Sequence, residues 1–149
     1  MTTSLSRLAD EADIIALRIG LGDALDRRDW SRMDRFFLPV IETDFSAFGA
    51  PVGPMSREAV IGMFRHAFRH DHVRTFQAYS NFQVRVTGDR AEMVSLLHGY
   101  HAGNGFEGGR TFELRARYRD SLVREDEGWR IAATAIDVIG MDGNPALIA

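Results

Sequence analysis

Acidic, histidine, tyrosine and serine side chains must carry any chemistry that this chain performs, because two other reactive residue types are absent. The sequence has no cysteine and no lysine, and all 18 of its basic residues are arginine. Thiol nucleophiles, disulfides and cysteine-ligated zinc are therefore excluded. Schiff-base chemistry on a lysine amine, which includes pyridoxal-phosphate enzymes, is excluded as well.

Asp26 is the carboxylate whose position calls for a reason. It ends a long helical pattern, where a negative charge opposes the helix dipole and costs about 0.3–1 kcal/mol. Its role is either structural, as a helix-end residue or a cap for the next helix, or chemical.

His101 is the histidine whose position points toward an interior. Alternation along residues 91–102 places His101 on one face of a strand with Leu97 and Gly99, and Glu92 on the other. If Glu92 faces solvent, then His101 faces the core. A hydrogen-bonded core histidine and a functional histidine are equally compatible with that placement.

Two further patterns predict structure rather than chemistry. His66, His70 and His72 lie close together, with a helical turn between the first two, but other positions carry the apolar stripe of their helix. We therefore expect a solvated helix face and no metal. The glycines of the sequence Gly-x-Gly-x-x-Gly at 103–108 precede a strand rather than a helix, so they predict a hairpin connection and not a nucleotide site.

The first half of the chain is expected to be mainly helical, with one strand. Apolar residues recur at helical spacing from residue 5 to 25, on a face of Leu5, Leu8, Ala12, Ile15 and Ile19. A second helix is predicted over 30–38, stopped by Pro39, followed by a strand over 40–48 and a loop marked by the glycines and prolines of 49–54. A third helix is predicted from a cap at Ser56 to residue 69.

The second half is expected to form long strands over residues 74–87, 91–102, 110–124 and 129–139. One face of the strand over 110–124 is strongly charged, so that side of the sheet must be partly solvated: Glu113, Arg115, Arg117 and Arg119. Helices followed by meandering strands predict an α+β layer with the helices on one sheet face.

Length and composition describe one globular domain over residues 1–149. Hydrophobic residues make up 45% and charged residues 26%, and the net charge of −3 gives no basic footprint for nucleic acid. No apolar run is long enough to span a bilayer, and the polar N-terminus lacks a signal-peptide pattern. A cytoplasmic protein with no nucleic-acid or membrane partner is expected.

A family resemblance emerges from short strings in a fixed order along nearly the whole chain. The chain resembles the SnoaL-like branch of the nuclear-transport-factor-2-like superfamily, which includes scytalone dehydratase, hexachlorocyclohexane dehydrochlorinase and ketosteroid isomerase. The strings are Asp-Arg-Arg-Asp-Trp at 26–30, Phe-Phe at 36–37, Glu-Thr-Asp-Phe at 42–45, Ser-Asn at 80–81, Gly-Asp-Arg-Ala at 88–91, Arg-Tyr at 117–118, Leu-Val-Arg at 122–124, Gly-Trp-Arg-Ile at 128–131 and Gly-Asn-Pro-Ala-Leu at 143–147.

The resemblance implies a cone-shaped α+β barrel, in which N-terminal helices close a curved, mostly antiparallel sheet around an apolar pocket. It also implies proton transfer without a metal or organic cofactor, and homo-oligomers. In dehydratase-like members, an Asp that matches Asp26 pairs with a catalytic His. Here the position of that His is held by Gln77, which cannot exchange a proton.

Other site residues follow from the same resemblance. His101 matches a second pocket histidine of the dehydratase, Tyr118 matches a common family tyrosine, and Phe45 replaces a pocket tyrosine. Asp137 is either a second carboxylate or a surface residue at a strand end. The remaining candidates for substrate contact are Trp30, Tyr79 and His98.

Two functions are expected from these residues. The first is a lyase or isomerase that acts on a small, apolar, cyclic metabolite, with Asp26 as base or orienting group and His101 as proton carrier. Gln77 and Tyr118 would bind or polarise a substrate oxygen. The alternative is a non-catalytic domain that binds a small hydrophobic ligand and has lost the usual Asp–His pair.

Overall fold

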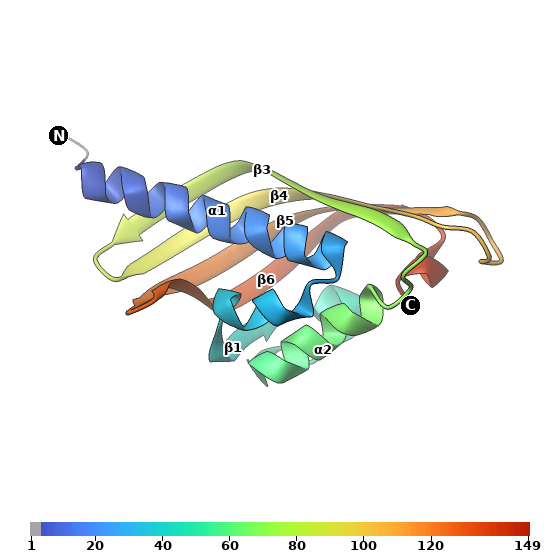
Figure 1. Cartoon of the computed structure of the whole chain (residues 1–149), viewed down its shortest axis with the longest axis horizontal. Coiled ribbons are helices and arrows are strands. Elements are labelled where there is room, and N and C mark those ends of the chain that lie inside the picture. Colours follow the sequence, from blue (N-terminus) through green and yellow to red (C-terminus); the bar gives the residue numbers. More distant parts are fainter. Residues whose placement is uncertain (1–3) are drawn as a thin grey trace.

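Six strands form one curved sheet, and two α-helices cover its concave face (Figure 1). The computed structural model describes residues 4–149. In chain order the elements are α1 (Leu5–Arg27), η1 (Trp30–Phe36), β1 (Phe37–Asp44), η2 (Ser46–Phe48), β2 (Gly53–Ser56), α2 (Arg57–Ala67), β3 (Arg74–Thr87), β4 (Arg90–Ala102), β5 (Thr111–Glu125), β6 (Gly128–Gly143) and η3 (Pro145–Leu147), where η marks a 3-10 helix.

The sheet order is β2-β1-β6-β5-β4-β3. All neighbouring strands are antiparallel except β1 and β6, which run parallel. This architecture confirms the predicted α+β class with a mostly antiparallel sheet and helices on one face. It is the half-open cone that the family resemblance implied.

The first helix has the predicted extent but not the predicted buried face. Ser4 caps α1 by accepting a hydrogen bond from the Arg7 amide at 3.2 Å, and Arg28 ends it in the left-handed conformation at φ 53°. The side chains predicted to be buried include Leu5, Leu8 and Ile19, which are 86%, 50% and 50% exposed. The buried face is instead Ile14, Arg18, Leu21, Gly22, Ala24 and Leu25.

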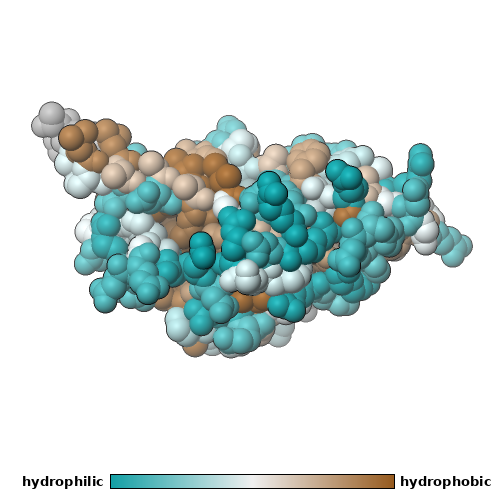
Figure 2. Space-filling view, in the orientation of Figure 1, coloured by the Kyte–Doolittle hydropathy of each residue, from teal (hydrophilic) through white to brown (hydrophobic). Residues whose placement is uncertain are grey.

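Figure 2 shows apolar side chains gathered at the N-terminal end of α1, beyond the part that packs on the sheet. Despite this apolar end, none of the helices in residues 4–149 has the length and hydropathy needed to cross a membrane.

The segment between the helices differs most from prediction. The expected helix over 30–38 is the shorter η1, and β1 begins at Phe37 rather than residue 40, so Pro39 lies inside a strand. The pairing of β1 with β6 is irregular between Phe37 and Glu42. Pro39, which has no amide proton to donate, lies in this irregular stretch and therefore removes no regular inter-strand hydrogen bond. The expected loop over 49–54 contains the start of a short strand, β2.

The four long strands lie where the alternation predicted them, within a few residues at each end. Strand β3 has a bulge between Ser80 and Gln83, where Asn81 adopts φ 54°. The inward side of β3 changes at this bulge. Before it, Thr75, Gln77 and Tyr79 are the less exposed side chains, and after it Phe82, Val84 and Val86.

A glycine allows α1 to lie directly on β3. A Cβ atom at Gly22 would stand 2.8 Å from Cε2 of Tyr79 and 3.2 Å from the backbone oxygen of Gln77. Because real Cβ atoms do not approach this closely, the helix or the strand would have to move.

We therefore expect Gly22→Ala to destabilise the protein by about 1–3 kcal/mol through overpacking, measured by urea denaturation. Gly62→Ala is the matched control, because Gly62 lies in α2 with open space around the new Cβ. That substitution should stabilise by about 0.5–1 kcal/mol through helix propensity. Equal effects of both substitutions would contradict the close approach of α1 and β3.

Candidate active site

An apolar cavity of about 550 Å³ lies between the helices and the inner face of the sheet. Its walls are supplied by α2, by the inner face of the sheet and by the C-terminal segment. The aliphatic and aromatic lining includes Leu25, Phe45, Met63, Phe64, Phe68, Leu97, Phe112, Leu114, Ile136, Pro145 and Ile148. A cavity of this size and character is suited to a small organic molecule.

Polar groups gather on the sheet side of the cavity: Gln77, Tyr79, His101 and Tyr118. They come from three neighbouring strands, β3, β4 and β5. Antiparallel pairing places Thr75 opposite His101 and Gln77 opposite Gly99. The register, rather than proximity in sequence, thus brings these side chains to one wall.

Gln77 lies between the end of α1 and His101. Its backbone N–H donates to Oδ2 of Asp26 at 2.9 Å, and its side-chain Nε2 lies 3.5 Å from Nε2 of His101. A Cβ at Gly99 would stand 3.0 Å from Oε1 of Gln77, so the missing side chain leaves room for the amide.

His101 is buried in the cavity wall, with 5% of its surface exposed. Its ring lies 5.2 Å from that of Phe68 and 6.0 Å from that of Phe112, between ring centroids. Burial, together with the nearby Arg28 cation, lowers the pKa of His101 to about 4. The imidazole is therefore neutral at pH 7, and its buried Nδ1 has no hydrogen-bond partner within residues 4–149.

Asp26 is half-buried beside the cavity rather than in its lining. Its carboxylate accepts hydrogen bonds from the Thr75 hydroxyl at 2.8 Å and from the Gln77 amide at 2.9 Å. Burial raises the pKa of Asp26, although these two hydrogen bonds act in the opposite direction. Over the described residues no hydrogen bond joins Asp26 to His101 directly, so Asp26 reaches His101 through Gln77.

Arg28 holds the chain together at this end of the cavity. Its guanidinium donates to the backbone oxygens of Phe68, His70 and Val73 at 3.1, 3.3 and 2.7 Å, and to the Thr75 hydroxyl at 3.2 Å. The segment after α2 and the start of β3 are thereby fixed against the end of α1. No pattern in the sequence indicates this role, although Arg28 lies in the string at 26–30.

A buried ion pair lies behind the two tyrosines. Arg18 of α1 donates from Nε to Oδ2 of Asp120 at 3.0 Å and from Nη2 to Oδ1 at 2.5 Å, and Thr134 donates to Asp120 at 2.7 Å. Burial alone would lower the pKa of Arg18, but the Asp120 carboxylate and the neighbouring Tyr79 and Tyr118 act together in the opposite direction, and the pKa is raised.

The guanidinium carbon of Arg18 lies 4.1 Å from the ring centroid of Tyr118 and 5.2 Å from that of Tyr79. Burial raises the pKa of both phenols, so they remain protonated hydrogen-bond donors at neutral pH.

Three predicted contact residues lie outside the cavity. His98 faces the opposite side of the sheet, 3.1 Å from Glu113, and Asp137 pairs there with Arg119 at 2.9 Å. Trp30 lies in η1 and packs against the main core. Strand alternation turns His98 and Asp137 outward, so Asp137 takes its surface alternative and His98 lies away from the cavity where substrate contact was expected.

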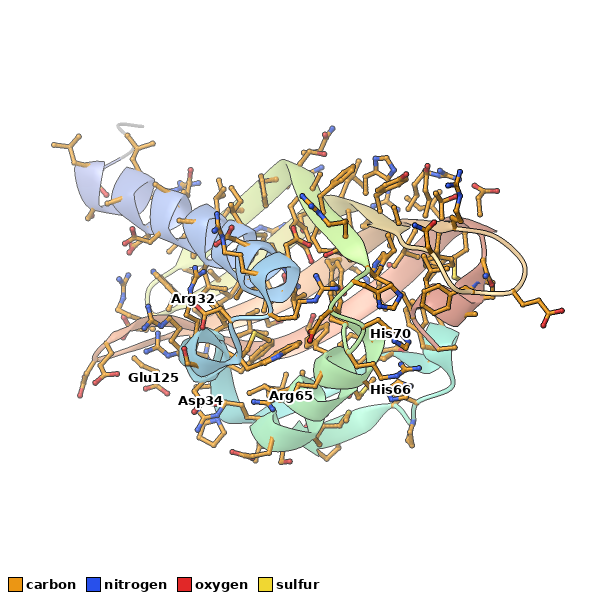
Figure 3. All side chains as sticks on the ribbon, turned by 45° about the vertical axis from the view of Figure 1, so that its right-hand side comes forward. Arg32, Asp34, Arg65, His66, His70 and Glu125 are labelled. Carbon is orange, nitrogen blue, oxygen red and sulfur yellow. The ribbon has the colours of Figure 1, made fainter. Side chains whose placement is uncertain are left out.

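The histidines near the end of α2 do not gather into a metal site. Figure 3 shows His66 and His70 at the C-terminal end of that helix. The structure described over residues 4–149 holds no group of three histidine or acidic side chains placed to bind a metal ion. His66 is exposed at the edge of the cavity, as a solvated helix face predicts.

With this fold and cavity, the chain belongs to the SnoaL-like domain family, which it matches over residues 6–135. An uncharacterized protein from Mycobacterium tuberculosis is 29% identical over 135 residues, which cover 86% of this chain and 84% of that protein.

Two solved structures share the fold. A Novosphingobium aromaticivorans protein assigned as a scytalone dehydratase is 16% identical, with a TM-score of 0.81 over 93% of this chain and 90% of that chain. The hexachlorocyclohexane dehydrochlorinase LinA-type3 from Novosphingobium barchaimii is 17% identical, with a TM-score of 0.77 over 95% and 94%.

The lowered pKa of His101 predicts a specific loss of stability in acid. Below the ordinary histidine pKa the unfolded chain takes up a proton on this ring, whereas the folded protein does not until about pH 4. The stability associated with the neutral ring is therefore complete above pH 6.5 and is lost as the pH falls toward 4. The shift corresponds to about 3 kcal/mol.

Between pH 7 and pH 4 the free energy of unfolding should fall less for His101→Gln than for the unmodified protein. The difference between the two decreases should be about 3 kcal/mol. His66→Gln, which replaces an exposed histidine, is the control variant. Parallel curves for the unmodified protein and His101→Gln would contradict a buried neutral imidazole.

The buried ion pair should matter far more than its surface counterpart. Asp120→Asn leaves the Arg18 charge buried and unpaired, and we expect a loss of about 3–5 kcal/mol in urea denaturation. Asp137→Asn removes the exposed pair with Arg119, and should cost less than about 1 kcal/mol. Similar losses for the two variants would show that Arg18 finds another partner or reaches water.

Proposed function

We propose that this protein is a lyase or isomerase that moves a proton on a small, uncharged, apolar and cyclic metabolite, with no cofactor. One observation carries the proposal: a neutral, buried histidine forms part of the polar wall of an otherwise apolar cavity. A positioned imidazole contributes roughly 10²–10⁴-fold to a proton transfer.

Each polar residue has a distinct role in the proposed reaction. His101 takes a proton from a carbon next to an electron-withdrawing group and later returns it. Gln77 and Tyr118 donate hydrogen bonds to the substrate oxygen as it gains negative charge. Asp26 is a positioning residue, since it fixes the backbone of Gln77 rather than facing the cavity.

The lining supports an uncharged substrate. No Asp, Glu or Arg side chain of the described residues lines the cavity, and apart from Gln77, His66 and His101 its lining side chains are aliphatic or aromatic. A charged ligand would lose its hydration there and would meet no Asp, Glu or Arg side chain in return. A substrate with an apolar ring and one or two oxygen atoms could pack its ring against the apolar lining and place its oxygen atoms against the polar side chains of the sheet.

The solved structures of similar fold favour the same class of reaction. One is a dehydrochlorinase and another is assigned as a scytalone dehydratase, so both names describe eliminations. Elimination and double-bond isomerisation share a first step, the removal of a proton from carbon. That step is the one proposed for His101.

A second candidate function is ligand binding without catalysis. It is favoured by the hydrogen bonds of Asp26, whose two oxygens are occupied by Thr75 and Gln77. The carboxylate therefore does not activate His101 by direct contact, and the catalytic His that the matching Asp of dehydratase-like relatives is expected to pair with is replaced here by Gln77.

Exchange of carbon-bound protons separates the two functions without knowledge of the natural substrate. We expect the protein to accelerate exchange of the α-protons of 2-tetralone in D₂O, followed by ¹H NMR against buffer alone. His101→Gln should reduce the acceleration by roughly 10²–10⁴-fold. Asp26→Asn should reduce it by roughly 10–100-fold, since it misplaces Gln77.

Binding of 2-tetralone is measured on the same samples by protein fluorescence. Binding without accelerated exchange would replace the enzyme with the binding function. Loss of exchange in Asp26→Asn but not in His101→Gln would assign the proton transfer to the carboxylate instead. His98→Gln, on the opposite sheet face, is the control and should leave exchange unchanged.

Two expectations from the sequence stay predictions. Homo-oligomers would be detected as a multiple of 16.7 kDa in light scattering after gel filtration. A cytoplasmic location would be tested by fractionation of the source cells.

A further inference from the structure

A second groove, of about 580 Å³, lies on the other face of the sheet, where β3 begins and the β4–β5 hairpin turns. Its walls include His72, Arg74, Tyr100, Asn104, Arg110 and Thr111. Tyr100 and Ala102 line this groove, whereas His101 between them faces the apolar cavity. The two sites are therefore back to back across β4, with separate linings.

The strand register brings two arginines to this groove from distant parts of the sequence. Arg74 on β3 lies opposite Ala102 on β4, and Ala102 lies opposite Thr111 on β5. Arg110 directly precedes Thr111, and its backbone oxygen accepts a hydrogen bond from Gly103 at 2.8 Å. Arg74 and Arg110 thus lie at the two sides of Ala102, across the neighbouring strands β3, β4 and the start of β5.

Neither arginine has a partner in the structure of residues 4–149. Arg74 and Arg110 are exposed, and neither side chain makes a hydrogen bond or an ion pair there. Other arginines of β5 differ: Arg115 pairs with Glu113 and Asp142, and Arg119 with Asp137. Two unpaired cations that share one concave site attract an anion, and its binding would relieve their repulsion.

Contacts within the protein hold the aromatic side chains that line the groove. Nε2 of His72 lies 3.0 Å from the backbone oxygen of Asn104, which ties the approach to β3 to the hairpin. The His72 ring also stacks on Phe106, with ring centroids 5.6 Å apart and planes 15° apart. Tyr100 provides an aromatic surface beside the arginines, stacked on Phe76 at 5.4 Å.

We propose that this groove binds a small organic anion, with Arg74 and Arg110 holding a carboxylate or phosphate group and Tyr100 contacting the rest of the molecule. Guanidinium groups suit both anions, because their planar N–H donors match paired oxygens. The groove shares no lining residue with the apolar cavity, so it is a separate site from the one proposed to transfer protons.

The site is tested by titrating the full chain with three probes and monitoring its amide signals by ¹H–¹⁵N NMR. The probes are inorganic phosphate, benzoate and the neutral benzamide. We expect phosphate or benzoate to shift the amide signals of residues around Tyr100 and Arg110, and benzamide to leave them unchanged. Tighter binding of benzoate identifies an aromatic carboxylate as the ligand class, and tighter binding of phosphate identifies a phosphate ester.

Arg74→Gln and Arg110→Gln should each weaken the binding by about tenfold or more, since each removes a charge-assisted hydrogen bond. Arg85→Gln is the matched control, because Arg85 is an exposed arginine farther along β3 and outside the groove. It should leave the affinity unchanged.

Absence of shifts with both anions would overturn the proposal, as would equal weakening by Arg85→Gln and the two groove variants. Exchange of 2-tetralone protons should be the same in Arg74→Gln as in the unmodified protein. The groove and the proton-transfer site can thus fail independently.

Discussion

A charged pair in the core, Arg18 with Asp120, determines where the first helix lies on the sheet. The pair is removed from water, so it is stable only while both groups keep their geometry. It ties α1, which lies on β3, to β5 through the Arg18 side chain, and Asp26 stands two helical turns farther along the same helix. From there Asp26 meets the start of β3 and holds the backbone of Gln77. The polar wall of the cavity thus depends on an ion pair that does not itself line the cavity.

The same pair explains why the strands were easier to predict than the first helix. On the long strands, apolar and polar residues alternate with few exceptions, so their extents followed from the sequence. On α1 the buried stripe passes through an arginine, and a search for apolar residues alone selected a face that is largely exposed. A buried arginine can be recognised only when its carboxylate partner is known, and Asp120 lies on a distant strand. Pro39 predicted the end of a helix, but it lies within β1, where the irregular pairing with β6 accommodates it.

The cavity could be predicted in part. Phe45, Gln77, Tyr79, His101 and Tyr118 all line it, and strand alternation already separates His101 from His98. The contacts of Asp26 could not be predicted, because they depend on how the end of a helix meets a strand much later in the chain. The role of Arg28 is of the same kind, since it binds backbone oxygens that carry no signature in the sequence. The family strings gave the positions of these residues but not their partners.

The bulge in β3 has a consequence for how this domain can vary. It divides one strand into a half that lines the cavity and a half that fills the core, with inward side chains of opposite parity. Loss of a single residue there would restore one continuous alternation, and one of the two halves would then face water. Replacement of side chains can therefore diversify the ligand wall during evolution, whereas the number of residues around Asn81 is fixed. The length of the chain at this point is as much a determinant of the site as any side chain in it.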